Sequence, residues 1–235
     1  MNPFAATWEF LLGGPKIGGL QLDRYSQWQR LPRAPVGLPH SRLRYVVVDT
    51  ETTGLDMRRD QLIAVGAAGI TAGKLDLSDC FEIVLRQQKA SADANILIHG
   101  IGGQSQVGGA EPKAAMLDFL DYLGKDPLVA FRAEFDRTIV EHAMISILGL
   151  RFRHPWIDLA FLLPALFPNT ECTSLDDWLK HFGLAGGERH HAVADAFATA
   201  MLFQVAMAEA TKEGMGTGAR LLAMQKAQLW LGKRS

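Results

Sequence analysis

Two carboxylates, Asp49 and Glu51, lie one residue apart directly after the apolar stretch Tyr45 to Val48. This stretch is β-branched or aromatic throughout, which predicts a strand buried on both faces. Alternate residues of an extended chain point to the same side, so Asp49 and Glu51 are expected to project together. Like charges at that distance repel unless a cation lies between them, and paired hard oxygens are the ligands that Mg²⁺ and Mn²⁺ prefer. The alternative is a pair of solvated acids in a loop.

Two further acids and a histidine lie at the ends of predicted elements. Asp136 lies in the first turn of a predicted helix, and Asp195 in the first turn of a long alanine-rich helix. His190 lies five residues before Asp195, on the loop leading into that helix. Each acid alone has an ordinary explanation, because carboxylates complement the dipole at a helix N-terminus. Together with Asp49 and Glu51 they predict a four-carboxylate pocket that requires divalent cations, with a histidine beside it as general base.

The composition indicates an ordinary folded domain. Of the 235 residues, 48% are hydrophobic and 21% are charged, which allows a substantial core and argues against global disorder. The two cysteines, Cys80 and Cys172, have neither metal-ligand spacing nor a disulfide framework, which favours a reducing, cytoplasmic setting. The apolar patch around Trp8 contains Glu9 and is too brief for a signal peptide. No apolar run is expected to reach the length of a membrane span, so we expect no membrane partner.

The net charge of −1 conceals an uneven distribution. Residues 1–44 and residues 210–235 each carry a net charge of +4, which leaves −9 for the segment between them. An acidic centre between two basic arms suits a divalent-metal site that acts on a polyanion. The alternative, surface charge scattered without functional meaning, stays open at this point.

Apolar spacing and turn residues predict strands alternating with helices after an initial meander, which is an α/β domain with three layers and a mixed sheet. Residues 1–41 are rich in glycine and proline and are expected to be an irregular extension with one short helix near Tyr25 to Arg30. The domain is expected over 42–213, and a C-terminal helix within 214–235 is expected to pack on it. The predicted strands are 45–48, 61–70, 74–86, 128–131 and 156–158. The predicted helices are 112–123, 134–148, a segment through 161–166, 174–182, 192–212 and 219–231, with a loop around His99.

The order of these motifs resembles one known family over roughly residues 43–207. Asp49-x-Glu51 followed by Thr52-Thr53-Gly54-Leu55 resembles the first motif of the DnaQ-like, or DEDD, 3′–5′ exonucleases. Asp136 matches the second motif, and His190 to Ala196 matches the third in its histidine form, so that His190 rather than His191 aligns with the catalytic histidine. The superfamily includes the proofreading epsilon subunit of bacterial DNA polymerase III, to whose branch the chain is most similar, together with ribonuclease T and oligoribonuclease. The resemblance implies a ribonuclease H-like fold with a mixed five-stranded sheet.

The resemblance also implies a mechanism with two Mg²⁺ or Mn²⁺ ions and in-line attack of water on the terminal phosphodiester of DNA or RNA. Asp49 is expected to bridge both ions, with Glu51 and Asp195 completing the site of the first. Asp136 is expected to support the second ion, and His190 to take the proton of the attacking water. Nucleoside 5′-monophosphates would leave from a free 3′ end.

The residues expected to bind substrate lie mainly in the turn after the first motif. Thr52, Thr53 and Leu55 are expected to line the pocket for the terminal nucleotide. His99, within the recurring His-Gly-Ile sequence, is expected either to contact that nucleotide or to be a structural loop histidine. The second motif usually has histidine and asparagine where this chain has Phe131 and Arg132, and this departure bears on how the nucleotide near that loop is held. Arg132 is expected to bind a substrate phosphate.

Other functions remain open from the sequence. One is a catalytically silent nuclease fold that binds nucleic acid or a polymerase or clamp partner, although retention of all five matched residues argues against it. A phosphatase with an aspartyl nucleophile would need an aspartate in place of Glu51 and a downstream lysine, and neither is found. Gln228 to Leu231 resembles segments that bind the bacterial sliding clamp, but the same region suits an amphipathic helix packed on the domain. DNA, RNA and short oligonucleotides stay open as substrates, and any proofreading role would need a polymerase in another chain.

Overall fold

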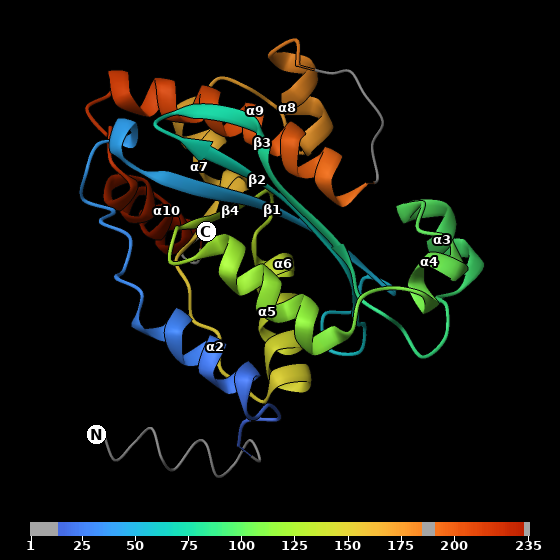
Figure 1. Ribbon diagram of the computed structural model, residues 1–235. Coiled ribbons are helices and arrows are strands. Elements are labelled where there is room, and N and C mark those ends of the chain that lie inside the picture. The colour runs from blue at the N-terminus through green and yellow to red at the C-terminus, as the bar shows by residue number, and fades with distance from the viewer. Residues whose placement is uncertain (1–13, 185–190, 233–235) are drawn as a thin grey trace.

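The computed structural model describes residues 14–184 and 191–232, and its centre is a mixed five-stranded sheet (Figure 1). The strand order across the sheet is β3-β2-β1-β4-β5. β2 pairs antiparallel with β1 and β3, whereas the β1–β4 and β4–β5 pairs are parallel. The strands are β1 (Arg44–Thr52), β2 (Leu62–Thr71), β3 (Lys74–Val84), β4 (Leu128–Ala130) and β5 (Trp156–Asp158). The predicted α/β fold with a mixed five-stranded sheet is confirmed.

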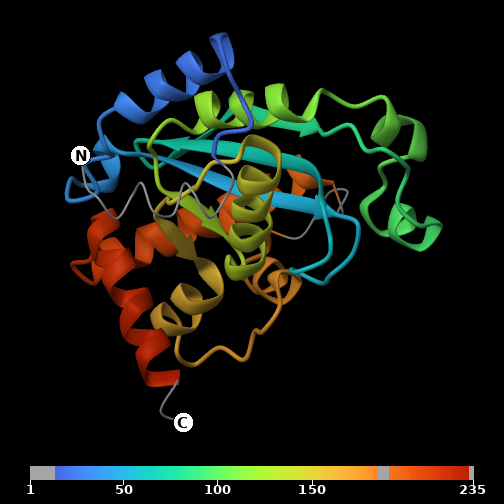
Figure 2. The ribbon, with the colours of Figure 1, turned by 90° about the horizontal axis from the view of Figure 1, so that it is seen from below.

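Helices cover both faces of the sheet, which gives the three layers seen in Figures 1 and 2. Val46 and Val48 of β1 belong to the core on one face, and Tyr45 and Val47 belong to the core on the other. The first face is covered by α5 (Pro112–Leu123), α6 (Glu134–Ala143) and the π-helical segment η2 (Met144–Leu148). The second face is covered by α7 (Leu159–Leu166), α8 (Leu175–His181), α9 (Ala192–Lys212) and α10 (Gly218–Gly232).

The central strand β1 is buried over Tyr45 to Val48, as its β-branched and aromatic residues predict. It continues farther than predicted, because Asp49 and Glu51 stay in register with Gly66 and Ala64 of β2. The ladder shifts only after Glu51, before the strand ends at Thr52. Both carboxylates therefore project from a hydrogen-bonded strand and not from a loop.

The segment before β1 is helical over more of its length than its glycine and proline content predicts. α2 (Leu20–Arg30) begins five residues before the predicted helix, directly after Gly19, and lies against α5. Trp28 is buried and its indole nitrogen donates a hydrogen bond to the carbonyl of Gly124, with 2.7 Å between the two atoms. Arg24 forms ion pairs with two aspartates of α5. The short 3-10 helix η1 (His40–Arg42) then leads into β1.

Two short helices, α3 (Asp93–His99) and α4 (Gly103–Val107), occupy the region around His99. The loop predicted over 99–103 is confirmed for residues 100–102, whereas His99 ends α3 and Gly103 begins α4. The pair projects from the body of the protein near the end of β1 (Figures 1 and 2). Leu97 and Ile98 of α3 are 85% and 60% exposed, so the apolar residues of this helix do not form a stripe that faces the core. Without such a stripe, the sequence does not show the periodicity that predicts a helix.

The helix predicted over 134–148 divides into two segments. α6 is α-helical to Ala143, and η2 continues it as a π-helix to Leu148. Both segments face the same core, so the apolar spacing alone does not distinguish them. Gly149, with φ of +69°, ends the segment, and a side chain there would overlap the backbone of Gly14.

α9 coincides with the predicted helix over 192–212. In the described part of the chain it is long and apolar enough to cross a membrane by length and composition, with a mean hydropathy of 1.3, so the expectation that no apolar run reaches that length is wrong. The structure places 56% of that window in the interior, as in the core helix of a folded domain. Its small alanine side chains let it lie close against β1 and β2.

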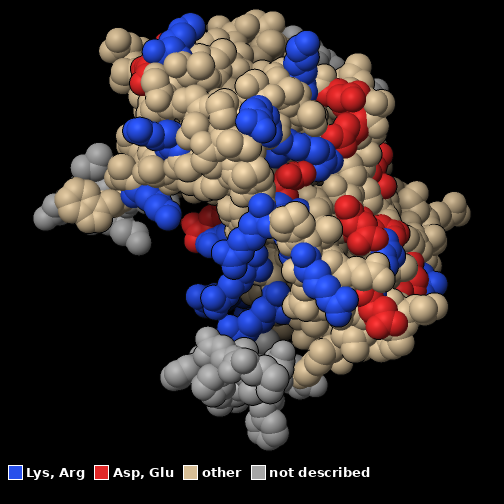
Figure 3. Space-filling view, turned by 60° about the vertical axis from the view of Figure 1, so that its left-hand side comes forward, with Lys and Arg blue, Asp and Glu red and all other residues tan. Residues whose placement is uncertain are grey.

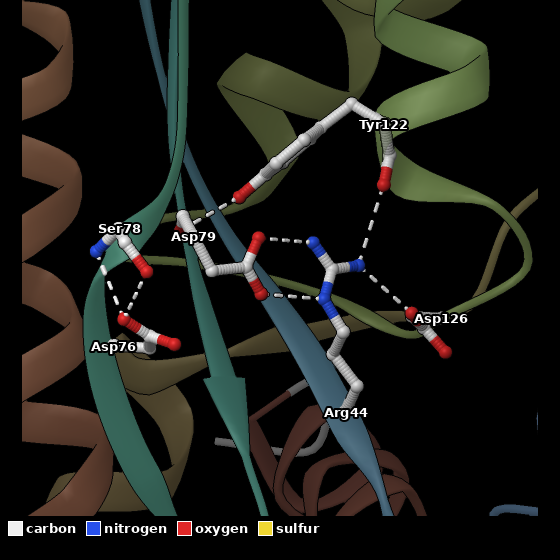
Figure 4. Close-up of polar contacts among 6 residues, drawn as sticks. All are labelled: Arg44, Asp76, Ser78, Asp79, Tyr122 and Asp126. Atoms are coloured by element: carbon white, nitrogen blue, oxygen red, sulfur yellow. Dashed lines mark hydrogen bonds and ion pairs between the residues drawn. The ribbon is translucent and has the colours of Figure 1, made fainter.

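A polar cluster ties the beginning of β1 to neighbouring elements (Figure 4). The guanidinium of Arg44 donates two hydrogen bonds of 2.8 Å to the carboxylate of Asp79 on β3 and one of 2.9 Å to Asp126. The hydroxyl of Tyr122 donates to the carbonyl of Asp79, and its ring lies 4.8 Å from the guanidinium. Hydrogen bonds from Arg44 lower the pKa of Asp79. This cluster fixes the end of β1 that is remote from Asp49 and Glu51.

Candidate active site

Three carboxylates from two elements meet at the far end of β1. Asp49 and Glu51 project from β1, and Asp195 projects from the first turn of α9. One oxygen atom from each of the three lies within 4.8 Å of the others. Asp195 is only 7% exposed, so the protein holds part of this negative charge away from bulk water.

Gly66 of β2 permits the approach of α9 to the sheet at this point. It is the register partner of Asp49 in the antiparallel ladder. A Cβ atom at Gly66 would overlap the backbone of Ala192 and Val193, because the beginning of α9 lies directly over β2. This close contact brings Asp195, which lies in the same first helical turn, beside the acids of the neighbouring strand.

Asp136 lies next to this cluster, in the first turn of α6, and is 6% exposed. The hydroxyl of Thr50, which lies between the two acids of β1, donates a hydrogen bond of 2.8 Å to its carboxylate. Burial raises the pKa of Asp136 to about 7, although the hydrogen bond from Thr50 acts in the opposite direction. The structure thus brings the fourth predicted carboxylate to the same end of β1, from the other face of the sheet.

The four carboxylates are electrostatically costly without a counter-ion. Burial raises the pKa of Glu51 to about 7, and the charges of Asp195 and Asp136 add to that rise. A hard divalent cation would offset the repulsion between the carboxylates, because Mg²⁺ and Mn²⁺ prefer carboxylate oxygens as ligands. Two ligands on opposite sides of Mg²⁺ are about 4.2 Å apart, since each lies about 2.1 Å from the ion. The three oxygens within 4.8 Å of one another fit such an ion.

The turn after β1 is held by its own side chains. The buried Thr52 hydroxyl donates to the carbonyl of Gly54, at 2.5 Å, and the Thr53 hydroxyl donates to the carboxylate of Asp60, at 2.7 Å. Leu55 is 87% exposed. Of the three residues predicted to line a nucleotide pocket, Leu55 is therefore free to meet a ligand, whereas Thr52 and Thr53 both have their hydroxyls engaged inside the turn.

His99 is buried, and both ring nitrogens have partners within its own region. The backbone N–H of Ile101 donates to Nδ1 at 3.0 Å, and Nε2 lies 3.3 Å from the hydroxyl of Ser91. Burial lowers the pKa of the ring. These contacts favour the structural role for His99 over contact with a nucleotide. The same region reaches the turn after β1 through Asn95, whose side chain donates to the carbonyl of Thr53.

Arg132 has a left-handed backbone, with φ of +60°, at the end of β4. Its backbone N–H donates to the carboxylate of Asp158 at 2.9 Å, and its guanidinium donates to the carbonyl of Thr173 at 3.2 Å. Asp158 also caps α7 by accepting from the N–H of Ala160. Burial raises the pKa of Asp158, and its charge adds to the raised pKa of Asp136. Sequence reasoning missed Asp158, whose one signal is an acid at the junction of a strand and a helix.

The predicted general base, His190, lies outside the described residues. His191 is described, and it is the exposed residue that precedes the first turn of α9. Its carbonyl accepts a hydrogen bond of 2.9 Å from the N–H of Asp195. α9 therefore begins two residues after His190 in the sequence, and Asp195 lies in its first turn.

The face that carries α2 and α10 is rich in basic side chains. Figure 3 shows lysine and arginine gathered there around a hollow. A cavity of about 440 Å³ on α6 and the segment before β5 is lined by Arg137, Arg151, Arg153 and His154, with Glu141 among them. The three arginines lie outside the two basic arms, so positive charge also gathers between the chain ends. Burial lowers the pKa of His154 to about 4, so its ring is uncharged near neutrality.

The fold and the acidic cluster define a class of protein. A mixed five-stranded sheet carries an acid pair on its central strand, and two more acids lie at the beginnings of flanking helices. Residues 46–203 match the family model described as Exonuclease (RNase_T), and the chain belongs to this exonuclease family. The predicted resemblance to the DnaQ-like exonucleases is thereby confirmed.

Relatives within this class include polymerase-associated proteins. DNA polymerase III PolC-type from Thermotoga maritima is 29% identical over 159 residues, which cover 68% of this chain and 11% of that protein. DNA polymerase III subunit epsilon from Aquifex aeolicus is 24% identical over 185 residues, which cover 78% of this chain and 91% of the subunit. Among solved structures, Exonuclease X in complex with 5′ overhanging duplex DNA superposes with a TM-score of 0.60 at 21% identity, covering 77% of this chain and 99% of that one. The chain thus spans about a tenth of the PolC-type relatives.

Proposed function

We propose that this chain is a metal-dependent 3′–5′ exonuclease that hydrolyses terminal phosphodiesters of DNA or RNA and releases nucleoside 5′-monophosphates. The observation that carries the proposal is the convergence of Asp49, Glu51 and Asp195 to within 4.8 Å in a member of the exonuclease family. We place this activity in a domain over residues 42–213.

The proposed cofactor is a pair of Mg²⁺ or Mn²⁺ ions. Asp49, Glu51 and Asp195 would hold the first, and Asp49 and Asp136 the second. When bound, the ions would supply Lewis-acid stabilisation of the negative charge on the terminal phosphodiester. Thr50 would keep Asp136 oriented through its 2.8 Å hydrogen bond.

The remaining roles belong to residues around the acids. His190 would accept the proton of the attacking water, since an imidazole titrates near neutrality. Leu55, 87% exposed in the turn after β1, would pack against the base of the terminal nucleotide, and the backbone around Thr53 would face its sugar. Arg132 would bind a phosphate through the guanidinium hydrogen atoms that do not bond to the carbonyl of Thr173.

The test compares Asp49→Asn and Asp195→Asn with the parent on 5′-labelled single-stranded DNA, duplex DNA with mismatched 3′ ends, and RNA of two to tens of nucleotides. With Mg²⁺ or Mn²⁺, the parent should release mononucleotides from the 3′ end, and both variants should lose this activity by at least about a thousandfold. Asp23→Asn, which removes an exposed acid of α2, is the matched control. Activity of the Asp49→Asn variant within a few-fold of the parent would refute the proposal. Binding of Mn²⁺ and DNA with no cleavage of any substrate would instead support a catalytically silent module.

We also propose that this chain associates with a DNA polymerase and is located in the cytoplasm. The named similarity to the epsilon subunit supports association with a DNA polymerase, and the two free cysteines suit a reducing compartment. α10 packs on the domain through the buried Leu221, and Gln225 accepts from the backbone of Asp158, whereas Trp230 is 58% exposed. A sliding clamp would therefore have to bind the last turns of α10. Deletion of residues 226–235, followed by measurement of clamp affinity and thermal stability, separates clamp binding from packing.

A further inference from the structure

An open groove of about 1200 Å³ lies beside the turn after β1. One wall is the β1–β2 turn, including Thr53 and Arg58. A second wall is the segment from Arg86 to Asn95, which leads into the projecting α3–α4 pair. The third wall is the second half of α6 and η2, including His142. Figure 1 shows these three segments converging at one end of the sheet.

This groove is separate from the acidic cluster. Its floor includes Leu62, Leu85 and Ile139, which belong to the core between the sheet and α5–α6. Asp49 and Glu51 alternate with Val48 and Thr50, so they project toward the opposite face, where α9 lies. The groove and the acids meet at the end of β1, because Thr53 lines the groove two residues after Glu51.

The groove carries positive charge that has no partner in the described ranges. Arg58, Arg86 and Lys89 are exposed, and none of them forms an ion pair with a carboxylate in residues 14–184 or 191–232. Arg59 lies 3.8 Å from Asp56 and is 87% exposed. Asp60, the one acid among the described residues that line the groove, accepts hydrogen bonds from Thr53 and from the backbone of Asp56. The groove therefore presents unneutralised cations to solvent.

The other lining groups suit a phosphate backbone and not a small apolar ligand. The groove exceeds the roughly 300–1,000 Å³ typical of small-molecule pockets and is open. Amide side chains, among them Gln61 and Gln88, line it together with the cations, and its described lining contains no phenylalanine, tyrosine or tryptophan. Cations and amides contact phosphates and sugars, whereas bases of single strands stack on aromatic rings. These lining groups therefore predict that the groove contacts the nucleic-acid backbone without preference for a base sequence.

We propose that this groove binds the sugar–phosphate backbone of the nucleic-acid strand upstream of the nucleotide being removed; the inference rests on the proposed function. A strand whose 3′ end lies at the acids would pass the end of β1 at Thr53 and enter the groove. His142 lies six residues after Asp136 on α6, which is about 9 Å along the helix axis. That distance corresponds to about three nucleotides of a strand stacked as in B-form DNA, at 3.4 Å per nucleotide. The groove thus distinguishes long strands from dinucleotides.

The test replaces the three unpaired cations together, as Arg58→Gln, Arg86→Gln and Lys89→Gln. For a 12-nucleotide single strand, KM should rise at least about tenfold with kcat within twofold of the parent, and a dinucleotide should be cleaved as by the parent. The slope of log affinity against log salt should become shallower by about 2, since each neutralised phosphate of a single strand contributes about 0.7. The matched control replaces three exposed cations outside the groove, as Lys74→Gln, Lys212→Gln and Arg220→Gln, which changes net charge equally.

Equal KM and salt slope in the groove variant and the control would overturn the inference while leaving the proposed function intact. A loss of affinity confined to 5′ overhanging duplexes would also overturn it, because the complementary strand would then occupy the groove. If the parent cleaves nothing, the proposed function fails separately. The groove is then tested by fluorescence anisotropy of a labelled 12-nucleotide strand without metal. Weaker binding by the groove variant than by the control supports the inference, and equal binding overturns it.

Discussion

The hydroxyl of Thr50 donates a 2.8 Å hydrogen bond to the buried carboxylate of Asp136, joining the central strand to the first turn of α6. Thr50 lies between Asp49 and Glu51, so one strand presents two acids to one face of the sheet and supports a third from the other. The hydrogen bond favours the ionised form of Asp136, against the effect of burial.

Thr50→Val should weaken divalent-metal binding by about tenfold, because a hydrogen bond to a charged group contributes about 1.5 kcal/mol or more. The same change should raise the pKa of Asp136 further, so the acidic limb of the pH–rate profile should move to higher pH. Calorimetric titration with Mn²⁺ and the pH dependence of kcat/KM measure the two effects. Thr50→Ser retains the hydroxyl and should resemble the parent. Identical metal affinity in the valine and serine variants would exclude this role for Thr50.

The stability of the metal-free protein should fall as pH rises through the range in which Glu51 ionises. The pKa of Glu51 is raised to about 7 in the folded protein from an ordinary value of 4.5, so between these values the unfolded chain loses its proton more readily than the folded one. The free energy of unfolding contributed by this group therefore declines from about pH 4.5 to about pH 7. Glu51→Gln should remove that contribution, giving a higher Tm than the parent at pH 8 and an equal one at pH 4.

A bound divalent metal ion should compensate for the negative charge of the ionised Glu51 carboxylate. Mn²⁺ should raise the Tm of the parent more at pH 8 than at pH 5, because protons compete with the metal for the carboxylates at low pH. The Glu51→Gln variant should show a smaller rise and little nuclease activity. A Tm increase with Mn²⁺ that is independent of pH in the parent would contradict this assignment of the site.

His190→Ala should lower kcat by about 10² to 10⁴-fold, the usual range for loss of a general base. The limb of the pH–rate profile that belongs to the imidazole should disappear, while the affinity for Mn²⁺ stays within a few-fold of the parent. His191→Ala is the matched control, because His191 is the exposed neighbour before α9. A similar loss in both variants would indicate disturbance of the entry into α9.

Arg132→Gly and Arg132→Ala separate the backbone of this residue from its guanidinium. Glycine adopts φ of +60° without steric cost, so the glycine variant should be more stable than the alanine variant by about 1 kcal/mol. Both should show an equal rise in KM if the guanidinium binds a substrate phosphate. Denaturant unfolding and steady-state kinetics supply the two measurements, and an unchanged KM in both variants would assign Arg132 a purely structural role.

Sequence reasoning succeeded where burial follows a regular period. The strand over Tyr45 to Val48 and the helix over 192–212 have apolar patterns that tertiary packing reinforces, and the three motifs placed the acids in the correct elements. It failed where the backbone conformation does not follow apolar spacing. α3 exposes Leu97 and Ile98 and so lacks a stripe facing the core, and the π-helical end of α6 has the same apolar face as an α-helix.

Within the candidate site, residues that act through other residues escaped prediction. Asp158 caps α7, which begins at the next residue, but it also holds the N–H of Arg132, which lies 26 residues earlier at the end of another strand. The groove beside β1 also combines cations from separate turns, and no spacing along the chain reveals that Arg58 and Arg86 face one cavity. Such relationships are set by the strand order β3-β2-β1, which places the β1–β2 turn beside the end of β3.

The absence of a side chain at Gly66 has a consequence for how this protein tolerates mutation. Gly66 binds no ligand and carries no reactive group, yet any larger residue would push the beginning of α9 away from the sheet. Gly66→Ala should therefore separate Asp195 from the two acids of β1 and silence the enzyme although all four carboxylates are retained. A survey of inactivating mutations confined to polar residues would overlook the position on which the spacing of the acids depends.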